Sequence, residues 1–496
     1  MRFDNLKDWL AWQESLNPKE IDLGLERSAG VLKQMGHVLA FDCPLITVAG
    51  TNGKGSIVAI LEAIAVSAGL NVCSYTSPHI FDYNERIKIN RQPVEDALIC
   101  EAFERIDHAR CQLAGDEHQL TYFEFGTLAA IDLFFRTKPD LVILEVGLGG
   151  RLDAVNIMEP DVSILSSVAI DHVDWLGDDR EKIGYEKAGI FRAGKTAICG
   201  DVQPPQSVIK RARDLGCDLL QREKDYRVIE AERAGISNSD DGWRLESPFS
   251  ELMNLPPPSL IGPFQKDNAA TAIVALQSLQ QRGLLDKLPA DHGLFRRILA
   301  SALPDIQLAG RFQKIHDVPA VYVDVAHNPH AALGLLSQLK ISAQASNFMG
   351  KTWAVVAMLA DKDIARVISN VATEIDHWCF AGLDAETSGI TRGLPVTDML
   401  ANLPPEILPD GLTTDTVILD ALRQELMDDL GHESQSNPCK MLSDTVSLAQ
   451  TVEQACVQVL SLAGKDDRII IFGSFYTVNE AMSYFSVMEK FGLKHS

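Results

Sequence analysis

A glycine-rich loop with a single lysine carries the strongest chemical signal in this sequence. Residues 49–56 are A-G-T-N-G-K-G-S, between an apolar run and a stretch of helical spacing. In such a loop the glycines let backbone N–H groups approach phosphate, the start of the helix adds positive partial charge, and Lys54 adds a full charge. Val48 stands where the usual pattern has its first glycine, and Gly55 moves the hydroxyl to Ser56. The loop predicts triphosphate binding; the alternative is a glycine-rich turn with an incidental lysine.

Three more polar side chains follow predicted strands, each close to the point where the strand ends. Ser77 follows the strand predicted at 71–76, Glu145 ends the run L-V-I-L-E-V, and His172 follows the strand predicted at 162–168. Ligands of open parallel sheets bind beyond the carboxyl ends of the strands. We therefore expect these side chains and Lys54 to face one crevice.

A carboxylate, hydroxyls and an imidazole beside a triphosphate suggest Mg²⁺. Glu145, Ser77 and Ser56 suit this hard cation, whereas imidazole is an unusual magnesium ligand. His172 would more safely serve a second metal site linked to the substrate. For His172 a hydrogen-bonded structural role stays open as the alternative.

Short apolar runs alternate with helical patterns and predict the framework for these residues. The first half predicts strands at 45–50, 71–76, 141–146 and 162–168, and helices at 55–68, 128–135, 178–191 and 268–281. Strands that alternate with helices indicate βαβ units and a mainly parallel sheet. The mixed segment 200–260, broken by Pro256–Pro258, is expected to be strand-rich or peripheral.

A second α/β series follows, with predicted strands at 321–325, 353–359 and 468–472. We place the domain boundary near residues 300–308: residues 1–303 form a P-loop-type ATP-binding domain and residues 304–496 a smaller Rossmann-like domain. The polar, acidic stretch 402–445 is expected to be a loop or an insertion.

The overall composition limits the classes of partner. Lys and Arg total 45 against 68 Asp and Glu, a net charge of −23, which argues against nucleic acid or anionic membrane as the main partner. No apolar run approaches the roughly 18 residues that span a bilayer. The nine cysteines contain no C-x-x-C pair, as is typical of a reducing compartment, so we expect a cytoplasmic protein.

A series of ordered motifs resembles the bifunctional dihydrofolate synthase/folylpolyglutamate synthases, which are relatives of the Mur ligases. The motifs are I-D-L-G-L-E-R (21–27), G-T-N-G-K-G-S (50–56), Y-T-S-P-H (75–79), L-T-Y-F-E-F-G (120–126), L-E-V-G-L-G-G-R-L-D-A (144–154), D-H-V-D-W-L-G (171–177), R-E-K-I-G-Y-E-K-A-G-I-F-R (180–192), A-G-R-F-Q (309–313), D-V-A-H-N-P-H-A (324–331), M-L-A-D-K-D-I (358–364) and F-G-S-F-Y-T-V (472–478). The resemblance implies an ATP- and Mg²⁺-dependent ligase that joins L-glutamate to 7,8-dihydropteroate and then lengthens folates. It also implies a monomer whose partners are small molecules.

The resemblance also implies roles for individual residues. The residues expected at the nucleotide are Thr51, Asn52, Gly53, Lys54, Gly55, Ser56, Asn268, Arg311, Asp324 and His327. The metal ligands would be Ser56, Ser77, Glu145 and His172, for two Mg²⁺ sites; whether a monovalent cation takes part stays unknown. The dihydropteroate pocket would contain Ile21, Asp22, Leu23, Thr121, Tyr122, Phe123, Glu124, Leu152, Asp153 and Ala154.

The catalytic residues implied are Lys54, His172, Lys187 and Arg311. Lys187 matches a lysine that this family carbamylates, and its alternative is a bare lysine paired with an acid. In the expected reaction ATP phosphorylates a carboxylate, and the glutamate amine then attacks the acyl phosphate. Arg311 lies in the second predicted domain, so we expect a closing motion to complete the site.

Three competing functions make different predictions. Another amide ligase of the same fold, such as a Mur-type enzyme, would show no dihydropteroate-dependent ADP release. A nucleotide sensor without catalysis would have lost Lys54, Glu145 or His172, and all three are present. A dinucleotide-binding oxidoreductase would need G-x-G-x-x-G, which G-L-G-G-R at 147–151 does not match.

Overall fold

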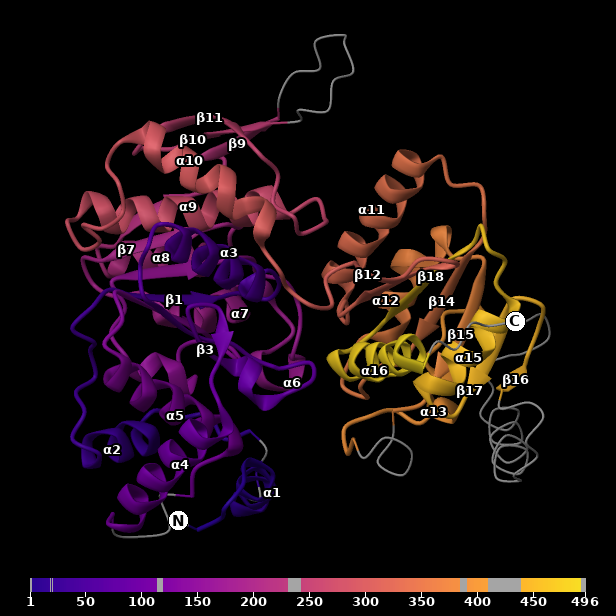
Figure 1. The fold of residues 1–496 in the computed structure, drawn as a ribbon, viewed down its shortest axis with the longest axis horizontal. Coiled ribbons are helices and arrows are strands. Elements are labelled where there is room, and N and C mark those ends of the chain that lie inside the picture. The colour runs from indigo at the N-terminus through magenta and orange to yellow at the C-terminus, as the bar shows by residue number, and fades with distance from the viewer. Residues whose placement is uncertain are drawn as a thin grey trace. The chain divides into compact units, whose positions relative to one another are not determined.

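The structure is a computed structural model, and it describes residues 2–17, 19, 21–113, 119–230, 242–383, 390–408 and 439–491. The chain forms two compact units (Figure 1). Unit 1 contains Met1–Leu260 and Phe264–Leu308, and unit 2 contains Ile261–Pro263 and Ala309–Ser496. Among the described residues, no helix is long and apolar enough to cross a membrane.

An eight-stranded sheet forms the centre of unit 1, in the order β4-β3-β2-β5-β1-β6-β7-β8. The pairs from β2 through β8 are parallel, and β3 and β4 add an antiparallel edge. The strands are β1 (Leu45–Ala49), β2 (Val72–Tyr75), β3 (Ile87–Ile89), β4 (Gln92–Pro93), β5 (Leu141–Glu145), β6 (Val162–Leu165), β7 (Thr196–Cys199) and β8 (Asp218–Gln221). Because β5 lies between β1 and β2, the strand order reverses here, which makes this the point where ligands of such sheets bind.

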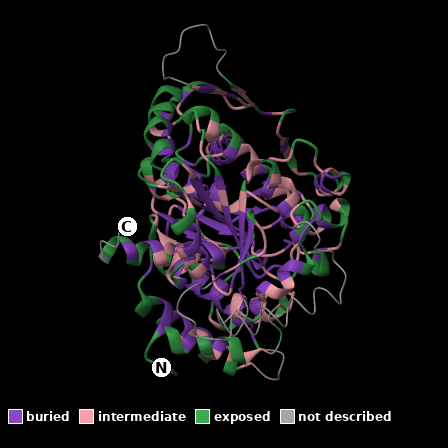
Figure 2. Cartoon of the chain, turned by 90° about the vertical axis from the view of Figure 1, so that its right-hand side faces the viewer, coloured by how far each residue is buried: buried purple, intermediate pink, exposed green. Residues whose placement is uncertain are grey.

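Helices cover both faces of this sheet, because its central strands are apolar on both sides. Ile46 and Val48 of β1 pack with one helical layer, whereas Leu45 and Ala49 pack with the other. The first layer contains α3 (Lys54–Ser67), α9 (Gln265–Gln281) and α10 (His292–Ala302). The second contains α1 (Leu6–Leu16), α2 (Glu26–Gln34), α4 (Asp96–Cys111), α5 (Tyr122–Thr137), α7 (Arg180–Lys187) and α8 (Gln206–Asp214). Figure 2 shows buried strands in the interior and exposed residues on the outer helices.

Shorter elements complete unit 1. An antiparallel sheet, β11-β10-β9, packs through Trp243 and Leu245 onto the layer of α9. The remaining elements are β9 (Arg227–Glu230), β10 (Trp243–Glu246), β11 (Glu251–Leu255), the short helix α6 (Val173–Leu176) and the 3-10 turns η1 (Tyr83–Arg86), η3 (Ala154–Ile157), η4 (Ala188–Ile190) and η5 (Leu303–Asp305). The strand-rich interpretation of the segment 200–260 is confirmed for its described residues.

Unit 2 contains a seven-stranded sheet in the order β12-β13-β18-β14-β15-β17-β16, parallel except at its two edge strands. The strands are β12 (Gln313–His316), β13 (Ala320–Asp324), β14 (Thr352–Val356), β15 (His377–Ala381), β16 (Cys439–Met441), β17 (Val446–Ala449) and β18 (Arg468–Phe472). One apolar cluster joins the sheet to α11 (Pro329–Ser346), α12 (Ile364–Val371) and α13 (Val396–Ala401). The helices α15 (Val452–Leu462) and α16 (Phe475–Phe491) contact the strands without joining that cluster, and η6 (Ala372–Glu374) follows α12.

The fold class expected from the sequence, two α/β units with mainly parallel sheets, is confirmed. The helix expected at 128–135 is longer and begins at Tyr122, because Thr121 and Glu124 form a capping box. Most of the stretch 402–445 lies outside the described residues, but Cys439–Met441 is a strand, so the loop interpretation is wrong there. The assignment of residues 1–303 and 304–496 to two functions stays a prediction; by packing, residues 304–308 belong to unit 1.

Candidate active site

The phosphate loop lies between β1 and α3 and is held by residues that follow β6. Thr51 N donates to Ser167 O at 2.8 Å, and Asn52 N donates to Ser167 Oγ at 3.1 Å. Ser166 Oγ donates to Asn52 O at 2.7 Å. A Cβ on Gly50 would lie only 1.9 Å from Ser166 Oγ, so the approach of the two segments requires a glycine there. The loop is therefore fixed in shape by the neighbouring strand end.

Two lysine ammonium groups converge on the phosphate loop. Lys54 Nζ donates to Gly50 O at 3.1 Å and lies 3.3 Å from Thr51 O. Lys187, at the end of α7, donates to the same Gly50 O at 3.1 Å. The pKa of Lys187 is lowered from 10.5 to about 7, mainly by burial and also by nearby Lys54, whereas Asp171 and Asp153 oppose the shift. The loop therefore has the positive charge of Lys54 and, beside it, an amine of low pKa.

Glu145 and Ser77 lie together beside the loop. Ser77 N donates to Glu145 Oε2 at 3.3 Å, and Glu145 is buried. A Cβ on Gly55 would lie 3.9 Å from both carboxylate oxygens, which places Glu145 against the start of α3. Ser56 is buried in the first turn of that helix. A carboxylate with neighbouring hydroxyls is a donor set that fits Mg²⁺ completed by phosphate oxygens and water.

His172 is the N-cap residue of α6 and has a left-handed conformation, φ +51°; its main-chain N–H donates to Asp171 Oδ1 at 2.8 Å. Its membership of the metal site stays a prediction. Within the described residues no group of three His, Cys, Asp or Glu side chains forms a metal cage. The predicted metal ligands include only two residues of these types, Glu145 and His172, and the others are the hydroxyls of Ser56 and Ser77. A group of three His, Cys, Asp or Glu side chains is therefore not expected at this site.

A flat aromatic surface lies two residues beyond Glu145. The ring of Phe123 covers Gly147 so closely that a Cβ there would lie 2.7 Å from Phe123 Cζ. Tyr75, at the end of β2, lies 6.0 Å away from Phe123 between ring centroids. The neighbouring Tyr122 packs edge-on against Tyr83, with centroids 5.6 Å apart. Phe123 therefore lies beside the end of β5, which carries Glu145.

The N-terminal segment contacts the start of α5 through Arg27. Arg27 Nη1 pairs with Asp22 Oδ2 at 2.9 Å, and Nη2 pairs with Glu124 Oε1 at 3.0 Å. Glu124 Oε2 also accepts from Thr121 N at 2.8 Å, so its carboxylate holds the start of α5 as well. Gly24 N donates to Leu152 O at 3.2 Å, which brings the segment of Ile21 and Leu23 beside the loop of Leu152.

Asp153 is buried at the start of η3, next to Ala154. Its two oxygens accept from Leu148 N at 2.8 Å and Val155 N at 3.1 Å. Burial raises the pKa of Asp153 to about 6, although these backbone hydrogen bonds and Lys54 act in the opposite direction. The carboxyl group is thus a buried acceptor within electrostatic reach of both site lysines.

Asn268, in the first turn of α9, lies against the phosphate loop: a Cβ on Gly53 would be 3.0 Å from Asn268 Oδ1. The other nucleotide residues expected from the resemblance belong to unit 2. There Asp324 accepts from Phe312 N and Ala326 N, both at 2.8 Å. The guanidinium of Arg311 lies 5.6 Å from the Phe475 ring centroid, and the His327 ring lies 6.4 Å from it. The predicted nucleotide-binding residues thus form two groups, one in unit 1 and one in unit 2.

Sequence reasoning missed several residues that build the site. Arg27 lies inside the motif I-D-L-G-L-E-R, and a basic residue five positions after Asp22 was the available signal. Gly147 lies in G-L-G-G and accepts the Phe123 ring because it has no side chain. The hydroxyls of Ser166 and Ser167 had no signal in the sequence, because their role depends on the pairing of β6 with β1.

Two family models match the chain. The Mur ligase middle domain matches residues 48–276, and the Mur ligase glutamate ligase domain matches residues 310–401. The first covers the phosphate loop and the aromatic surface, and the second covers Arg311, Asp324 and His327.

Similar proteins of known name match nearly the whole chain. The dihydrofolate synthase/folylpolyglutamate synthase of Escherichia coli (strain K12) is 36% identical over 477 residues, 96% of this chain and 94% of the relative. The structure of E. coli FolC in complex with DHPP and ADP has a TM-score of 0.76 and 35% identity, covering 98% of this chain and 99% of that one. A bifunctional folylpolyglutamate synthase/dihydrofolate synthase with Mn, AMPPNP and L-glutamate bound has a TM-score of 0.74 and 35% identity, over 99% and 98%.

Proposed function

The chain belongs to the Mur ligase family, among its dihydrofolate synthase/folylpolyglutamate synthases, and we propose that it joins L-glutamate to 7,8-dihydropteroate with ATP. The product is dihydrofolate, and the same chemistry adds further glutamates to folates. The enzyme is an ATP-dependent acid–amino-acid ligase that requires a divalent cation. Its substrates are small molecules.

One observation supports this proposal above the others: the end of β5 lies beside both the phosphate loop and a flat aromatic surface. Glu145 lies against Gly55 of the phosphate loop, and Gly147, two residues later, lies under the Phe123 ring. A pterin bound on Phe123 would therefore lie beside the strand end that carries the acidic residue. Transfer of phosphate from ATP to the acceptor carboxylate requires the acceptor to bind next to the phosphate site.

The reaction proceeds in two balanced steps. An oxygen of the dihydropteroate carboxylate attacks the γ-phosphorus of ATP, and ADP leaves, which gives an acyl phosphate. The glutamate amine then attacks the acyl carbon, and inorganic phosphate leaves with the bond electrons as the amide forms. The amine loses a proton in this step. Such transfers depend on positioning and on neutralising charge more than on covalent help from the protein.

The residues of unit 1 are assigned to position the substrates and to neutralise the charge on the phosphates. We assign the phosphates to Thr51–Ser56, with Lys54 as the fixed positive charge, and adenine-side contact to Asn268. Ser56, Ser77, Glu145 and His172 would hold divalent cations at two sites, with His172 at the second, and such cations neutralise charge on the phosphates when they are bound. The roles of Arg311, Asp324 and His327 of unit 2 in nucleotide binding stay predictions.

The acceptor pocket is assigned to three segments: Ile21–Leu23, Thr121–Glu124 and Leu152–Ala154. Phe123 offers an apolar face for a fused ring system. Asp153 offers an acceptor for ring N–H groups, and with a pKa of about 6 it is mainly ionised at pH 8. The Glu124 carboxylate already pairs with Arg27, so its role is to hold the pocket together.

A product assay tests the function. The protein is incubated with ATP, Mg²⁺ and L-glutamate in three reactions: one with dihydropteroate, one with a folate monoglutamate and one with no acceptor. ADP and the pterin product are measured in each. We expect ADP release that depends on either acceptor, and dihydrofolate by mass spectrometry from the first. Lys54→Met should remove both. If adding dihydropteroate does not increase ADP release, the result would favour a ligase with a different acceptor and would contradict the proposal.

We also propose that the enzyme acts as a monomer in the cytoplasm, as its family resemblance implies. Light scattering on the purified chain, with and without substrates, tests the first statement. A dimer mass under assay conditions would contradict it.

A further inference from the structure

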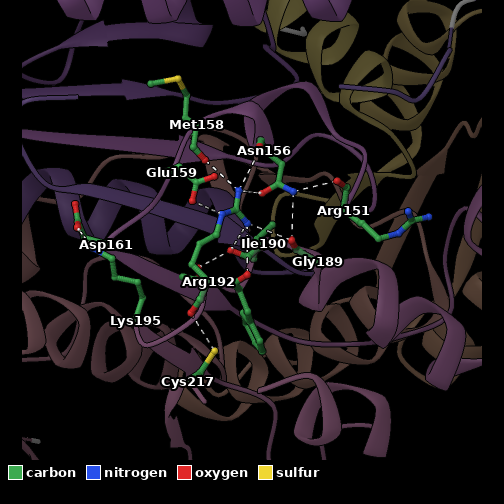
Figure 3. Close-up of polar contacts among 12 residues, drawn as sticks. Arg151, Asn156, Met158, Glu159, Asp161, Gly189, Ile190, Arg192, Lys195 and Cys217 are labelled. Carbon is green, nitrogen blue, oxygen red and sulfur yellow. Dashed lines mark hydrogen bonds and ion pairs between the residues drawn. The ribbon is translucent and has the colours of Figure 1, made fainter. Parts of the chain in front are cut away.

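Arg192 lies at the centre of a dense hydrogen-bond network beside the active-site loops (Figure 3). Its Nη2 donates to the main-chain oxygens of Asn156 at 3.0 Å and Met158 at 3.2 Å, and to Asn156 Oδ1 at 3.0 Å. Its Nη1 donates to Ile190 O at 3.1 Å and lies 3.3 Å from Gly189 O. We call these four main-chain oxygens, of Asn156, Met158, Gly189 and Ile190, the carbonyl cradle.

Asn156 strengthens the same connection from the other side. Its Nδ2 donates to Arg151 O at 3.0 Å and to Gly189 O at 3.2 Å. The main chain adds a bond from Arg151 N to Glu186 O at 2.8 Å. Two segments far apart in the sequence are thus joined: residues 151–158 and residues 186–192.

Each of these segments carries a residue assigned to the active site. Asp153 and Ala154 of the acceptor pocket lie in the first, and Lys187 lies in the second. No β-strand pairing joins the two segments, so their spacing depends on the main-chain and side-chain hydrogen bonds described above. A cradle oxygen that lost its donor and stayed buried would lack a hydrogen bond, which is unfavourable and so favours one arrangement of the loops.

The chemistry of Arg192 matches this task. A guanidinium has five N–H donors in a rigid planar fork, whereas a lysine ammonium is a point charge with three rotatable donors. Arg192 directs its two terminal nitrogens at the cradle and its Nε at Glu159 Oε2, at 2.7 Å. The Glu159 side chain is 59% exposed, so that ion pair is a minor contribution.

We propose that Arg192 is a positioning residue for the ligase reaction: through the carbonyl cradle and Asn156 it sets Asp153 and Ala154 relative to Lys187, and so sets the affinity for dihydropteroate. The phosphate loop has its own contacts with Ser166 and Ser167, and Lys187 adds one more contact, to Gly50 O. Loss of the cradle contacts should therefore weaken binding of the pterin substrate more than binding of ATP. The inference rests on the proposed function.

The test compares kcat and KM of the full-length enzyme for both substrates in Arg192→Lys. We expect KM for dihydropteroate to rise about tenfold, as a small displacement of a binding loop allows, with KM for ATP within about threefold of wild type. Glu159→Gln is the matched control: it removes the ion pair, leaves the cradle intact and should keep both KM values. Lys195→Met, which removes the adjacent surface pair with Asp161, should do the same.

A merely structural arginine would give a different result. It would lower the amount of folded enzyme and thus the apparent kcat, with KM for dihydropteroate unchanged, and that result overturns the inference. If Arg192→Lys does not fold, Asn156→Ser takes its place, because it removes the amide group that donates to Arg151 O and Gly189 O. A rise in KM for dihydropteroate without a comparable rise in KM for ATP would again support the inference, and an unchanged KM for dihydropteroate would overturn it. If the wild-type enzyme shows no dihydropteroate-dependent turnover, the proposed function fails instead, so the two failures are distinguishable.

Discussion

Two lysine side chains share one carbonyl oxygen of the phosphate loop. Lys54 and Lys187 both donate to Gly50 O at 3.1 Å. Burial lowers the affinity of the Lys187 amine for its proton, and the nearby charge of Lys54 acts in the same direction. Against the weaker opposing effects of Asp171 and Asp153, these two causes bring the pKa of Lys187 to about 7. The site thus contains a strong cation beside an amine that is easily neutral.

That neutral amine predicts carbamylation of Lys187. CO₂ adds to an unprotonated amine with loss of one proton, and at pH 8 a pKa of about 7 leaves about nine-tenths of the amine neutral, against less than about 1% at 10.5. With ¹³C-labelled bicarbonate we expect a carbamate signal by NMR in the wild type and in Lys195→Met, but not in Lys187→Met. A signal that persists in Lys187→Met would place the modification elsewhere; no signal in the wild type would refute it.

Asp153 predicts a pH-dependent difference in stability. Its native pKa of about 6 lies above the ordinary 3.8, so between these values the native state holds a proton that the unfolded state has lost. The contribution of this carboxyl group to stability therefore falls as pH rises through that window. Asp153→Asn has no titrating group at this position. As pH rises from 4 to 6.5, its free energy of unfolding should therefore increase relative to that of wild type by up to about 3 kcal/mol.

Thermal unfolding of both proteins across that pH range measures the difference. A constant offset between wild type and Asp153→Asn at every pH would contradict the assigned pKa. At pH 8 the same variant should raise KM for dihydropteroate, because an amide presents one acceptor oxygen where the carboxylate presents two.

At the scale of single elements, strand ends were predictable and helix starts were less so. The strands predicted at 45–50, 141–146 and 468–472 correspond to β1, β5 and β18, because buried parallel strands are short apolar runs. The helix predicted at 128–135 lacks the first six residues of α5, 122–127. Their signal is the sequence T-Y-F-E at 121–124, which is an S/T-x-x-E capping box as well as part of a motif of the family.

That capping box makes a prediction about α5. Thr121 Oγ1 accepts from Glu124 N, and Glu124 Oε2 accepts from Thr121 N. Thr121→Ala should cost about 1 kcal/mol of stability and raise KM for dihydropteroate, because Phe123 lies in the turn that loses its cap. Thr121→Ser keeps the hydroxyl and is the matched control. Equal KM values for the two variants would show that the cap does not position the pocket.

The contacts that complete the site could not be predicted from local pattern. Arg27 meets Glu124 across 97 positions, and Arg192 meets Asn156 across 36. Such pairs depend on how helices and loops pack after the sheet forms, and neither propensity nor hydrophobic period encodes that packing. The residue types were visible in the motifs, but their partners required coordinates.

At the scale of the whole molecule, each of the two units has its own parallel sheet and its own set of predicted nucleotide residues. In unit 1 the set comprises Thr51–Ser56, which follow β1, and Asn268 in the first turn of α9. In unit 2 Arg311 precedes β12, Asp324 ends β13 and His327 follows it, and the Arg311 and His327 side chains lie beside the Phe475 ring. An enzyme that needs both sets should fail when either is damaged, even though both units stay folded.

Arg311 tests that requirement. If its guanidinium neutralises charge on the transferring phosphate, Arg311→Ala should lower kcat by about 100- to 1000-fold, the usual cost of losing one such group. Circular dichroism and unfolding temperature should stay close to wild type. Arg366→Ala, at a side chain of unit 2 that is 73% exposed, is the matched control and should keep full turnover. Near-normal turnover of Arg311→Ala would remove this residue from the mechanism.

Transfer of oxygen from the acceptor to phosphate tests most directly whether this protein activates a carboxylate with ATP. Dihydropteroate labelled with ¹⁸O in both carboxyl oxygens is converted with ATP and L-glutamate, and the phosphate and the pterin product are analysed by mass spectrometry. The account predicts one ¹⁸O in each phosphate released and one in the new amide. Unlabelled phosphate, or label recovered in AMP, would contradict it.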